Sequence, residues 1–354
     1  MDIKAMLRER ALRFLREGRY RGIRSPKPND IFERISYISP DDLAIEGYLR
    51  RKPLAAFNPG AVLRDGVLQV FPRLVFEYYW YVSSIGFFTL SLKELEDKGP
   101  LPNKKYPTRI VIYPSNTWDM VGCEDARVVF EGGKYHILYT ARKVLDLLGR
   151  YWPIQGYALL DENLRLISKK FFRVVYRSKS YLAMIKDSAF LEFRGSNVTM
   201  VTRPSIPMDG EENLLEIGWW GEVNLSTGEI ELETLRPILP TEPWELKLGY
   251  STNAVKLSSN EYLVGWHGVA QDYVYRNGLL IVSPEGELLG ITGYILEPKG
   301  INEFYGDRPG VIFGDGLVLH KEYVYWIGGI SDYAMAIFRT ELDKVMEQMR
   351  WVKG

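Results

Sequence analysis

Polar side chains recur at matching places in similar segments of this chain. In four segments a polar residue lies a fixed distance before a turn, and a cation or a histidine lies beyond the turn. The residues before the turn are Asn58, Asp125, Asp187 and Thr252. Those beyond it are Arg73, Arg142, Arg203 and His267, and Asp332 follows in a fifth segment. One polar strand end is ordinary in any β protein, but a whole set at one register favours a binding site.

Two carboxylates and several cations beside apolar and aromatic residues suit chemistry at a glycosidic bond. An acid protonates the leaving oxygen in such a reaction, while an anion or an activated water attacks the anomeric carbon. Asp125 is the best candidate for the acid, because its neighbours Cys123 and Ala126 are apolar and partial desolvation favours the protonated form. The alternative role for Asp125 is an ordinary ion pair with Arg127.

The cations decide which nucleophile such a site accepts. Phosphate is best held by arginine forks and lysine point charges, and Arg203, Lys247 and His267 are candidates for that seat. No group of His and Cys residues has metal-ligand spacing, so no metal is expected. We therefore expect no cofactor, with inorganic phosphate as a co-substrate.

The elements that must position these residues are repeated hairpins. Each copy is a short apolar strand, a tight turn and a second strand rich in Tyr, Val, Leu and Trp, and the copies recur about every 64 residues. The turns lie at Gly66, Gly133, Gly195, Asn260 and Lys321. Such a repeat predicts an all-β fold, a five-bladed β-propeller in which equivalent residues of all blades converge on one axis.

Two short helical segments are expected outside the repeats. Residues 1–24 form an N-terminal helical extension with Met6, Leu7, Leu12, Phe14 and Leu15 at helical spacing, and residues 25–354 form the catalytic propeller domain. A short helix is also expected from Thr340 to Val352. The arginine-rich first helix is too small for its own core, so we expect it to pack on the propeller or on a second subunit of a homo-oligomer.

Composition excludes several classes of protein. The 354 residues contain 45 Lys and Arg against 45 Asp and Glu, so the basic excess typical of proteins that bind nucleic acid or anionic membranes is missing. The single cysteine excludes an internal disulfide framework. The sequence contains no transmembrane run and no signal peptide, which predicts a cytoplasmic protein.

An ordered series of short motifs resembles glycoside hydrolase family 130, the inverting β-mannoside phosphorylases and mannosidases with five-bladed propellers. From about Phe57 to Tyr333 the motifs are FNPGAV, PRL followed by SSIG, GCEDARVV, KDSAFLEF, VTRPS, LKLG, GWHGV, the spacing of Tyr275 and Gly278, and GGISD. Their order and spacing together carry the resemblance.

The resemblance implies a role for each matching residue. Asp125 would be the general acid, acting through a hydroxyl of the mannose. The residues that bind the mannosyl unit would be Asn58, Arg73, Asp187, Tyr305 and Asp332. The residues that bind phosphate would be Lys186, Arg203, Lys247, His267 and Tyr275. Hydrolytic members tend to carry glutamates in place of these basic residues, so the resemblance favours a phosphorylase that releases mannose 1-phosphate from a β-mannoside.

Other functions stay open at this stage. Lys186 and Asp187 stand where phosphorylases often have Arg-Asn, and Asp187, Glu242 or Glu245 could repel phosphate or activate water. A β-mannosidase is therefore one alternative, a mannosyltransferase that uses a nucleotide sugar is another, and a carbohydrate-binding propeller without catalysis is a third. The acceptor sugar would depend on the loops at residues 144–152 and 207–213.

Overall fold

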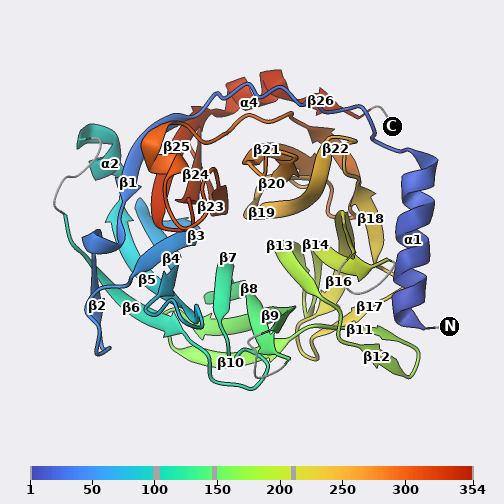
Figure 1. Cartoon of the computed structure of the whole chain (residues 1–354), viewed down its shortest axis with the longest axis horizontal. Helices are drawn as coiled ribbons and strands as arrows, with labels where there is room; N and C mark the ends of the chain where they lie inside the picture. Colours follow the sequence, from blue (N-terminus) through green and yellow to red (C-terminus); the bar gives the residue numbers. More distant parts are fainter. Residues whose placement is uncertain (1, 99–103, 146–149, 209–212, 353–354) are drawn as a thin grey trace.

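The computed structural model describes residues 2–98, 104–145, 150–208 and 213–352. In these ranges the strands form five sheets that stand around a common centre, an all-β, propeller-like arrangement with few helices (Figure 1). Within the same ranges, none of the helices combines the length and the apolar character that a membrane crossing requires.

Each sheet begins at the centre with an antiparallel hairpin, and these hairpins are the repeated segments of the sequence. The pairs are β3 (Ala55–Arg64) with β4 (Val67–Val75), β7 (Cys123–Glu131) with β8 (Lys134–Val144), β13 (Ile185–Arg194) with β14 (Asn197–Pro207), β19 (Glu245–Ser258) with β20 (Glu261–Ala270), and β23 (Ile312–His320) with β24 (Tyr323–Ile330). The turns Asp65–Gly66 and Gly132–Gly133 have positive φ at both residues. That conformation suits a tight hairpin turn and explains the turn residues of the repeat.

The outer strands complete the five sheets. They are β5 (Ser83–Ser91), β6 (Tyr106–Ile112) and β2 (Leu43–Glu46) in the first sheet; β9 (Tyr151–Asp161) and β10 (Leu166–Phe171) in the second; β16 (Gly218–Asn224), β17 (Glu229–Glu231), β11 (Arg173–Tyr176), β12 (Lys179–Tyr181), β15 (Leu214–Glu216) and β18 (Arg236–Leu239) in the third; β21 (Tyr275–Val282), β22 (Leu288–Ile291) and β26 (Arg350–Trp351) in the fourth; and β25 (Ala334–Glu341) and β1 (Glu33–Ile38) in the fifth.

The two ends of the chain close the ring. Strand β1, from the N-terminal part, pairs antiparallel with β25 of the last sheet, and β26 pairs with β22. The inner strand β23 contacts β3, so the fifth sheet lies against the first. Apolar side chains fill the interfaces between sheets; Phe71 and Ile85 of the first sheet, for example, pack with Tyr139 and Ile154 of the second. This closure fixes the spacing of the inner strands around the centre.

Helix α1 (Ile3–Glu17) lies against the third sheet. Its buried residues Ile3, Leu7, Ala11 and Phe14 join the core of that sheet, which includes Trp219. The side chain of Arg10 on the same helix donates to the carbonyl of Leu235 at 2.7 Å. The apolar face of the helix is therefore covered within the chain, which is the first of the two expected ways of packing it.

The other helices are short. They are α2 (Leu92–Lys98), α3 (Gly300–Phe304), α4 (Leu342–Gln348) and the 3₁₀ turn η1 (Pro40–Asp42). Helix α4 is shorter than the segment expected from Thr340 to Val352, because β25 continues through Glu341 and residues 350–351 form β26. Backbone pairing with neighbouring strands replaces the helix at both ends of that segment.

Candidate active site

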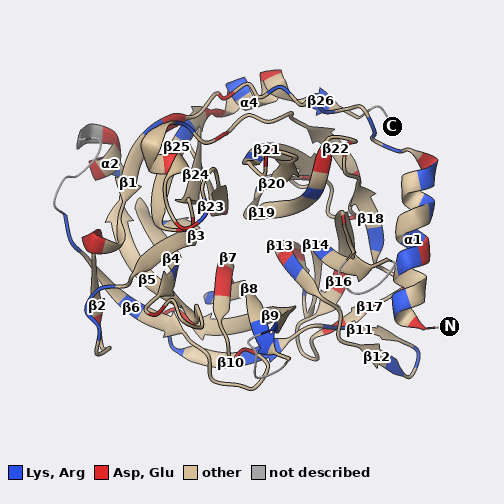
Figure 2. Ribbon diagram, in the orientation of Figure 1, with Lys and Arg blue, Asp and Glu red and all other residues tan. Residues whose placement is uncertain are grey.

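A shift in strand register turns the first polar residue of three hairpins toward the centre. In β3, β7 and β13 two residues stand opposite one residue of the partner strand, and the first of the two is Asn58, Asp125 or Asp187. Their φ angles are 44°, 55° and 54°. Asn and Asp tolerate this left-handed conformation better than most residues, which explains their presence in the repeat. Figure 2 shows charged residues at the ends of β7 and β13 that face the centre of the ring.

These residues meet in a central cavity of about 460 Å³. Ten of the eleven residues expected in the site line it: Asn58, Arg73, Asp125, Lys186, Asp187, Arg203, Lys247, His267, Tyr275 and Asp332. Tyr305 does not line this cavity. It directly follows α3 and is 80% exposed.

Asp125 lies on one wall of the cavity and is held by the first sheet. Asn58 donates from Nδ2 to Oδ1 of Asp125 at 3.0 Å, and Nη1 of Arg73 lies 3.3 Å from the same oxygen. Nη2 of Arg73 also pairs with Oε1 of Glu124 at 2.6 Å, and Arg142 reaches that oxygen at 3.0 Å. Because Glu124 accepts from Arg73, it fixes the guanidinium group of Arg73 beside Asp125.

Arg127 does not form the ion pair with the Asp125 side chain that was the alternative role for this carboxylate. Its Nη1 donates to the main-chain carbonyl of Asp125 at 2.8 Å. Nη2 lies 3.0 Å from Asp315 and 3.5 Å from Asp187, so Arg127 connects three inner strands beneath the cavity. Burial raises the pKa of Asp315 well above its usual range, and Arg127 opposes this effect.

The opposite wall of the cavity carries Arg203, which is neutralised by two carboxylates. Its Nη2 lies 2.7 Å from Oδ2 of Asp187, and its Nη1 pairs with Glu216. Burial alone would raise the pKa of Asp187, but Arg203, Lys186 and Arg127 outweigh burial and lower it. The pKa of Glu216 falls to about 2 in the same way, against burial and mainly through Arg203. Both carboxylates are therefore ionised at neutral pH.

Two lysines of this wall stand outside the ion pairs that Arg203 forms with Asp187 and Glu216. Lys186 and Lys247 form no ion pair with any residue that the structure describes. Nζ of Lys247 lies 4.9 Å from the centre of the Tyr275 ring, and burial together with Arg203 lowers the pKa of Lys247. An anion in the cavity would offset that desolvation and favour the charged form of the amine.

His267 and Tyr275 form the neutral part of this wall. Their rings stack with centroids 5.5 Å apart, and Nδ1 of His267 lies 3.0 Å from the hydroxyl of Ser251. Burial lowers the pKa of His267 to about 3, with Arg203 and Lys247 adding to burial and Asp187 opposing it. His267 therefore carries no charge at neutral pH and can offer a ring nitrogen only for hydrogen bonding.

Asp332 lies at a third side of the cavity, in the turn between β24 and β25. Nε of Arg308 lies 3.3 Å from its carboxylate. Burial raises the pKa of Asp332 to about 6, and the charge of Asp125 adds to this effect while Arg73 and Arg308 oppose it. Asp332 can therefore exchange a proton near neutral pH.

Glu242 and Glu245 lie away from this cavity, which removes them as candidates for repelling phosphate or activating water. Oε2 of Glu245 pairs with Arg24 at 2.6 Å, with both side chains buried, and Glu242 accepts from the main-chain nitrogens of Gly22 and Arg24. The two glutamates hold the N-terminal segment against the fourth sheet. In the described part of the chain, no group of three or more His, Cys, Asp or Glu side chains is placed to hold a metal ion.

Several residues of the site were not found from the sequence. Glu124 belongs to the motif that contains Asp125, and its position next to the acid is the signal that could have found it. Glu216 and Asp315 carry no local signal, because β15 is short and Asp315 lies two residues off the repeat register. Residues 146–149 and 209–212, parts of the loops expected to choose the acceptor, lie outside the described residues.

Comparison with known proteins identifies relatives of this chain and solved structures with a similar fold. A curated relative, the Beta-1,2-mannobiose phosphorylase of Listeria innocua, is 22% identical over 292 residues, which cover 78% of this chain and 74% of the relative. The solved structure of that phosphorylase with beta-1,2-mannobiose has a TM-score of 0.67 at 17% identity and covers 88% of this chain and 96% of its own.

A second solved structure adds a more distant likeness in fold. It is MPT-4, a mannose phosphorylase from Leishmania mexicana in complex with a phosphate ion, with a TM-score of 0.56 at 12% identity over 99% of this chain and 97% of its own. Residues 23–351 match the model of a family described as beta-1,4-mannooligosaccharide phosphorylase. On this match over most of its length, the chain belongs to glycoside hydrolase family 130.

Proposed function

We propose that this protein is an inverting β-mannoside phosphorylase that transfers a mannosyl unit to inorganic phosphate and releases mannose 1-phosphate. Membership of family 130 makes it a mannoside-active glycoside phosphorylase or glycosidase. The observation that carries the finer assignment is the pair of lysines without ion-pair partners, Lys186 and Lys247, in the cavity that also holds Asp125. We further propose that the five sheets are the five blades of a propeller over residues 25–354, with residues 1–24 as an extension.

The proposed reaction follows from the positions of Asp125 on one wall of the cavity and of Arg203, Lys186 and Lys247 on the opposite wall. Asp125 supplies the proton that reaches the leaving oxygen, through a sugar hydroxyl, as the bond from that oxygen to the anomeric carbon breaks. A phosphate oxygen held by Lys186, Lys247 and Arg203 attacks the anomeric carbon from the other face, so its configuration inverts. Asn58, Arg73, Asp187 and Asp332 would hold the mannosyl ring, while His267 and Tyr275 would complete the phosphate seat.

Charge favours phosphate over water as the nucleophile. Arg203, Lys186 and Lys247 bring three positive charges to this wall against the two negative charges of Asp187 and Glu216, which leaves an excess of one positive charge. An unbalanced buried cation is costly unless an anion joins it. Hydrolysis stays the second candidate because Asp187 is an ionised carboxylate at the same wall.

The test is to incubate the protein with β-1,2- and β-1,4-mannobiose, with and without inorganic phosphate, and to follow the products by ³¹P and ¹H NMR. Mannose 1-phosphate that forms only with phosphate supports the proposal. Free mannose that appears at equal rates in both incubations assigns the protein as a β-mannosidase. Incubation of the Asp125→Asn variant controls for contaminating activity.

A further inference from the structure

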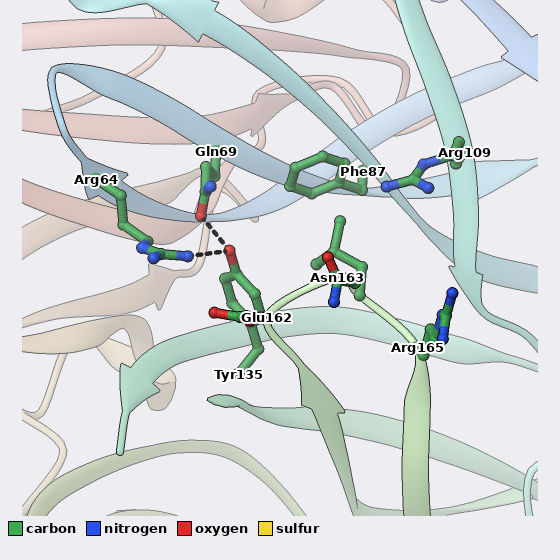
Figure 3. A pocket seen from close by; sticks show the side chains of 9 residues that line it. Arg64, Gln69, Phe87, Arg109, Tyr135, Glu162, Asn163 and Arg165 are labelled. Atoms are coloured by element: carbon green, nitrogen blue, oxygen red, sulfur yellow. Dashed lines mark hydrogen bonds between the residues drawn. The ribbon is translucent and has the colours of Figure 1, made fainter. Parts of the chain in front are cut away.

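A second cavity, of about 580 Å³, lies between the first and second sheets (Figure 3). Arg64 and Gln69, at the turn end of the β3–β4 hairpin, belong to it. Asn58 of the central cavity lies six residues before Arg64 in β3, so at about 3.3 Å per residue the two sites are about 20 Å apart along the strand. The second cavity is therefore separate from the one that contains Asp125.

Three arginines from three separate segments line this second cavity. Arg64 ends β3, Arg109 lies in β6, and Arg165 lies in the turn before β10. None of the three has an ion-pair partner among the residues described in the structure. The lining contains one acidic residue, Glu162. The cavity therefore carries an excess of positive charge in a chain whose formal net charge is zero.

Arg64 is held in place before any ligand binds. Its guanidinium carbon lies 3.7 Å from the centre of the Phe130 ring. Nη1 donates to the hydroxyl of Tyr135 at 2.8 Å, and that hydroxyl donates to Oε1 of Gln69, also at 2.8 Å. Tyr135 is only 1% exposed, so the polar group that orients Arg64 is itself fixed in the core.

The turn that carries Arg165 is also preformed. The carboxylate of Asp161 accepts from the main-chain nitrogens of Asn163 at 2.9 Å and Arg165 at 2.8 Å. Figure 3 shows Arg109 and Arg165 on one side of the cavity and Arg64 on the other, with Asn163 between them. Because Arg64 and the backbone of this turn are held in place, while Arg109 and Arg165 are exposed, a ligand that bridges the two sides would bind without reordering the backbone of the turn.

We propose that this second cavity binds a phosphorylated monosaccharide. Arg109 and Arg165 would hold the phosphate, since guanidinium groups match its geometry. Asn163, Gln69 and Glu162 supply donors and acceptors for sugar hydroxyls, and the ring of Phe87 supplies an apolar surface of the kind on which a sugar ring packs. The volume lies within the usual range of small-molecule sites.

The test is calorimetric titration with three probes: glucose 6-phosphate, inorganic phosphate and mannose. It uses the Lys247→Gln variant as background, so that binding in the central cavity is weakened. The Arg109→Gln/Arg165→Gln change is then added, and Arg177→Gln, an exposed arginine outside both cavities, is the matched control. Hydrogen exchange at residues 162–165 reports on the site directly, and melting temperatures check folding.

We expect saturable binding of glucose 6-phosphate that is weakened at least tenfold by Arg109→Gln/Arg165→Gln and unchanged by Arg177→Gln. Hydrogen exchange at residues 162–165 should slow on binding. No saturable binding, or equal binding in the double variant, would overturn the proposal. Equal affinities for inorganic phosphate and glucose 6-phosphate would overturn the proposal that the cavity recognises the sugar. Glucose 6-phosphate is neither a substrate nor a product of the proposed phosphorolysis, so failure of that activity leaves the result with this probe interpretable.

Discussion

The side-chain amide of Asn58 donates a hydrogen bond of 3.0 Å to Oδ1 of Asp125, although 67 residues separate the two along the chain. Arg73 reaches the same oxygen. Within the described ranges no donor reaches Oδ2, so this oxygen is available to carry the proton that the proposed reaction requires. The first sheet thus orients the carboxyl group of Asp125 in the second sheet through Oδ1.

Replacing Asp125 by Asn should abolish turnover without unfolding the protein. The amide has nearly the same shape but cannot donate the carboxylic proton, and loss of a general acid costs about 10²- to 10⁴-fold in rate. The measurement is kcat for release of the sugar product, with Asp343→Asn on the exposed face of α4 as control. A variant that keeps more than a tenth of the wild-type rate would contradict the role of Asp125.

Replacing Lys247 by Gln should weaken phosphate binding more than mannoside binding. The change removes one of the two lysines without an ion-pair partner, so we expect KM for phosphate to rise at least tenfold, the effect of about 1.4 kcal/mol. Lys256→Gln, on the exposed part of the same strand, should change neither constant. An equal rise in both KM values would show that Lys247 supports the cavity as a whole and not the phosphate seat.

Asp332 should make stability depend on pH in a defined window. Burial raises the pKa of Asp332 to about 6 in the folded state. Its favourable contribution to the free energy of unfolding is therefore complete below pH 4 and is lost as pH rises through 6. The loss amounts to about 3 kcal/mol. Asp332→Asn should therefore be more stable than wild type above pH 6 and equal to it near pH 4.

Urea unfolding of both proteins between pH 4 and pH 8 measures this difference. Subtracting the two curves removes the contributions of the other carboxylates, including Asp187, whose lowered pKa acts in the opposite direction. A difference that does not change with pH would show that Asp332 ionises normally in the folded protein.

Gly249→Ala should disturb the cavity directly. A Cβ atom at this position would lie 2.4 Å from Oδ2 of Asp187 and 2.9 Å from Nε of Arg203, which is too close for either to stay in place. We expect a loss of about 1–3 kcal/mol in unfolding free energy together with reduced phosphate-dependent turnover. Gly293→Ala is the control, since its Cβ would meet nothing nearer than 3.9 Å. Equal melting temperatures and rates for the two variants would contradict the close packing at Gly249.

The repeat made much of the site predictable from the sequence. Asn58, Asp125 and Asp187 occupy one register, and residues in one register of a closed ring of hairpins must meet near its axis. Their residue type was informative as well, because Asn and Asp tolerate the left-handed backbone at the strand irregularity. Arg73 and Arg203 followed from the same argument, applied to the second strand of each hairpin.

Other parts of the site depend on contacts that no local pattern encodes. Tyr305 lies outside the cavity, and Glu242 and Glu245 pair with the N-terminal segment around Arg24. Glu216, from a three-residue strand, reaches Arg203. In each case the position of the side chain depends on where a loop or a terminal segment packs on the ring, and residues near it in sequence do not determine that packing.

The sequence by itself determined the all-β repeat, the residue types at its centre and the resemblance to family 130. Only the tertiary structure decided which charges neutralise one another. Coulombic interactions fall off with distance and depend on burial. Arg203 therefore pairs with Asp187 only once the sheets have closed into a ring. The same closure leaves Lys247 without an ion-pair partner among the described residues. That closure turns a recurring pattern of polar residues into a cavity with Asp125 on one wall and Arg203, Lys186 and Lys247 on the opposite wall.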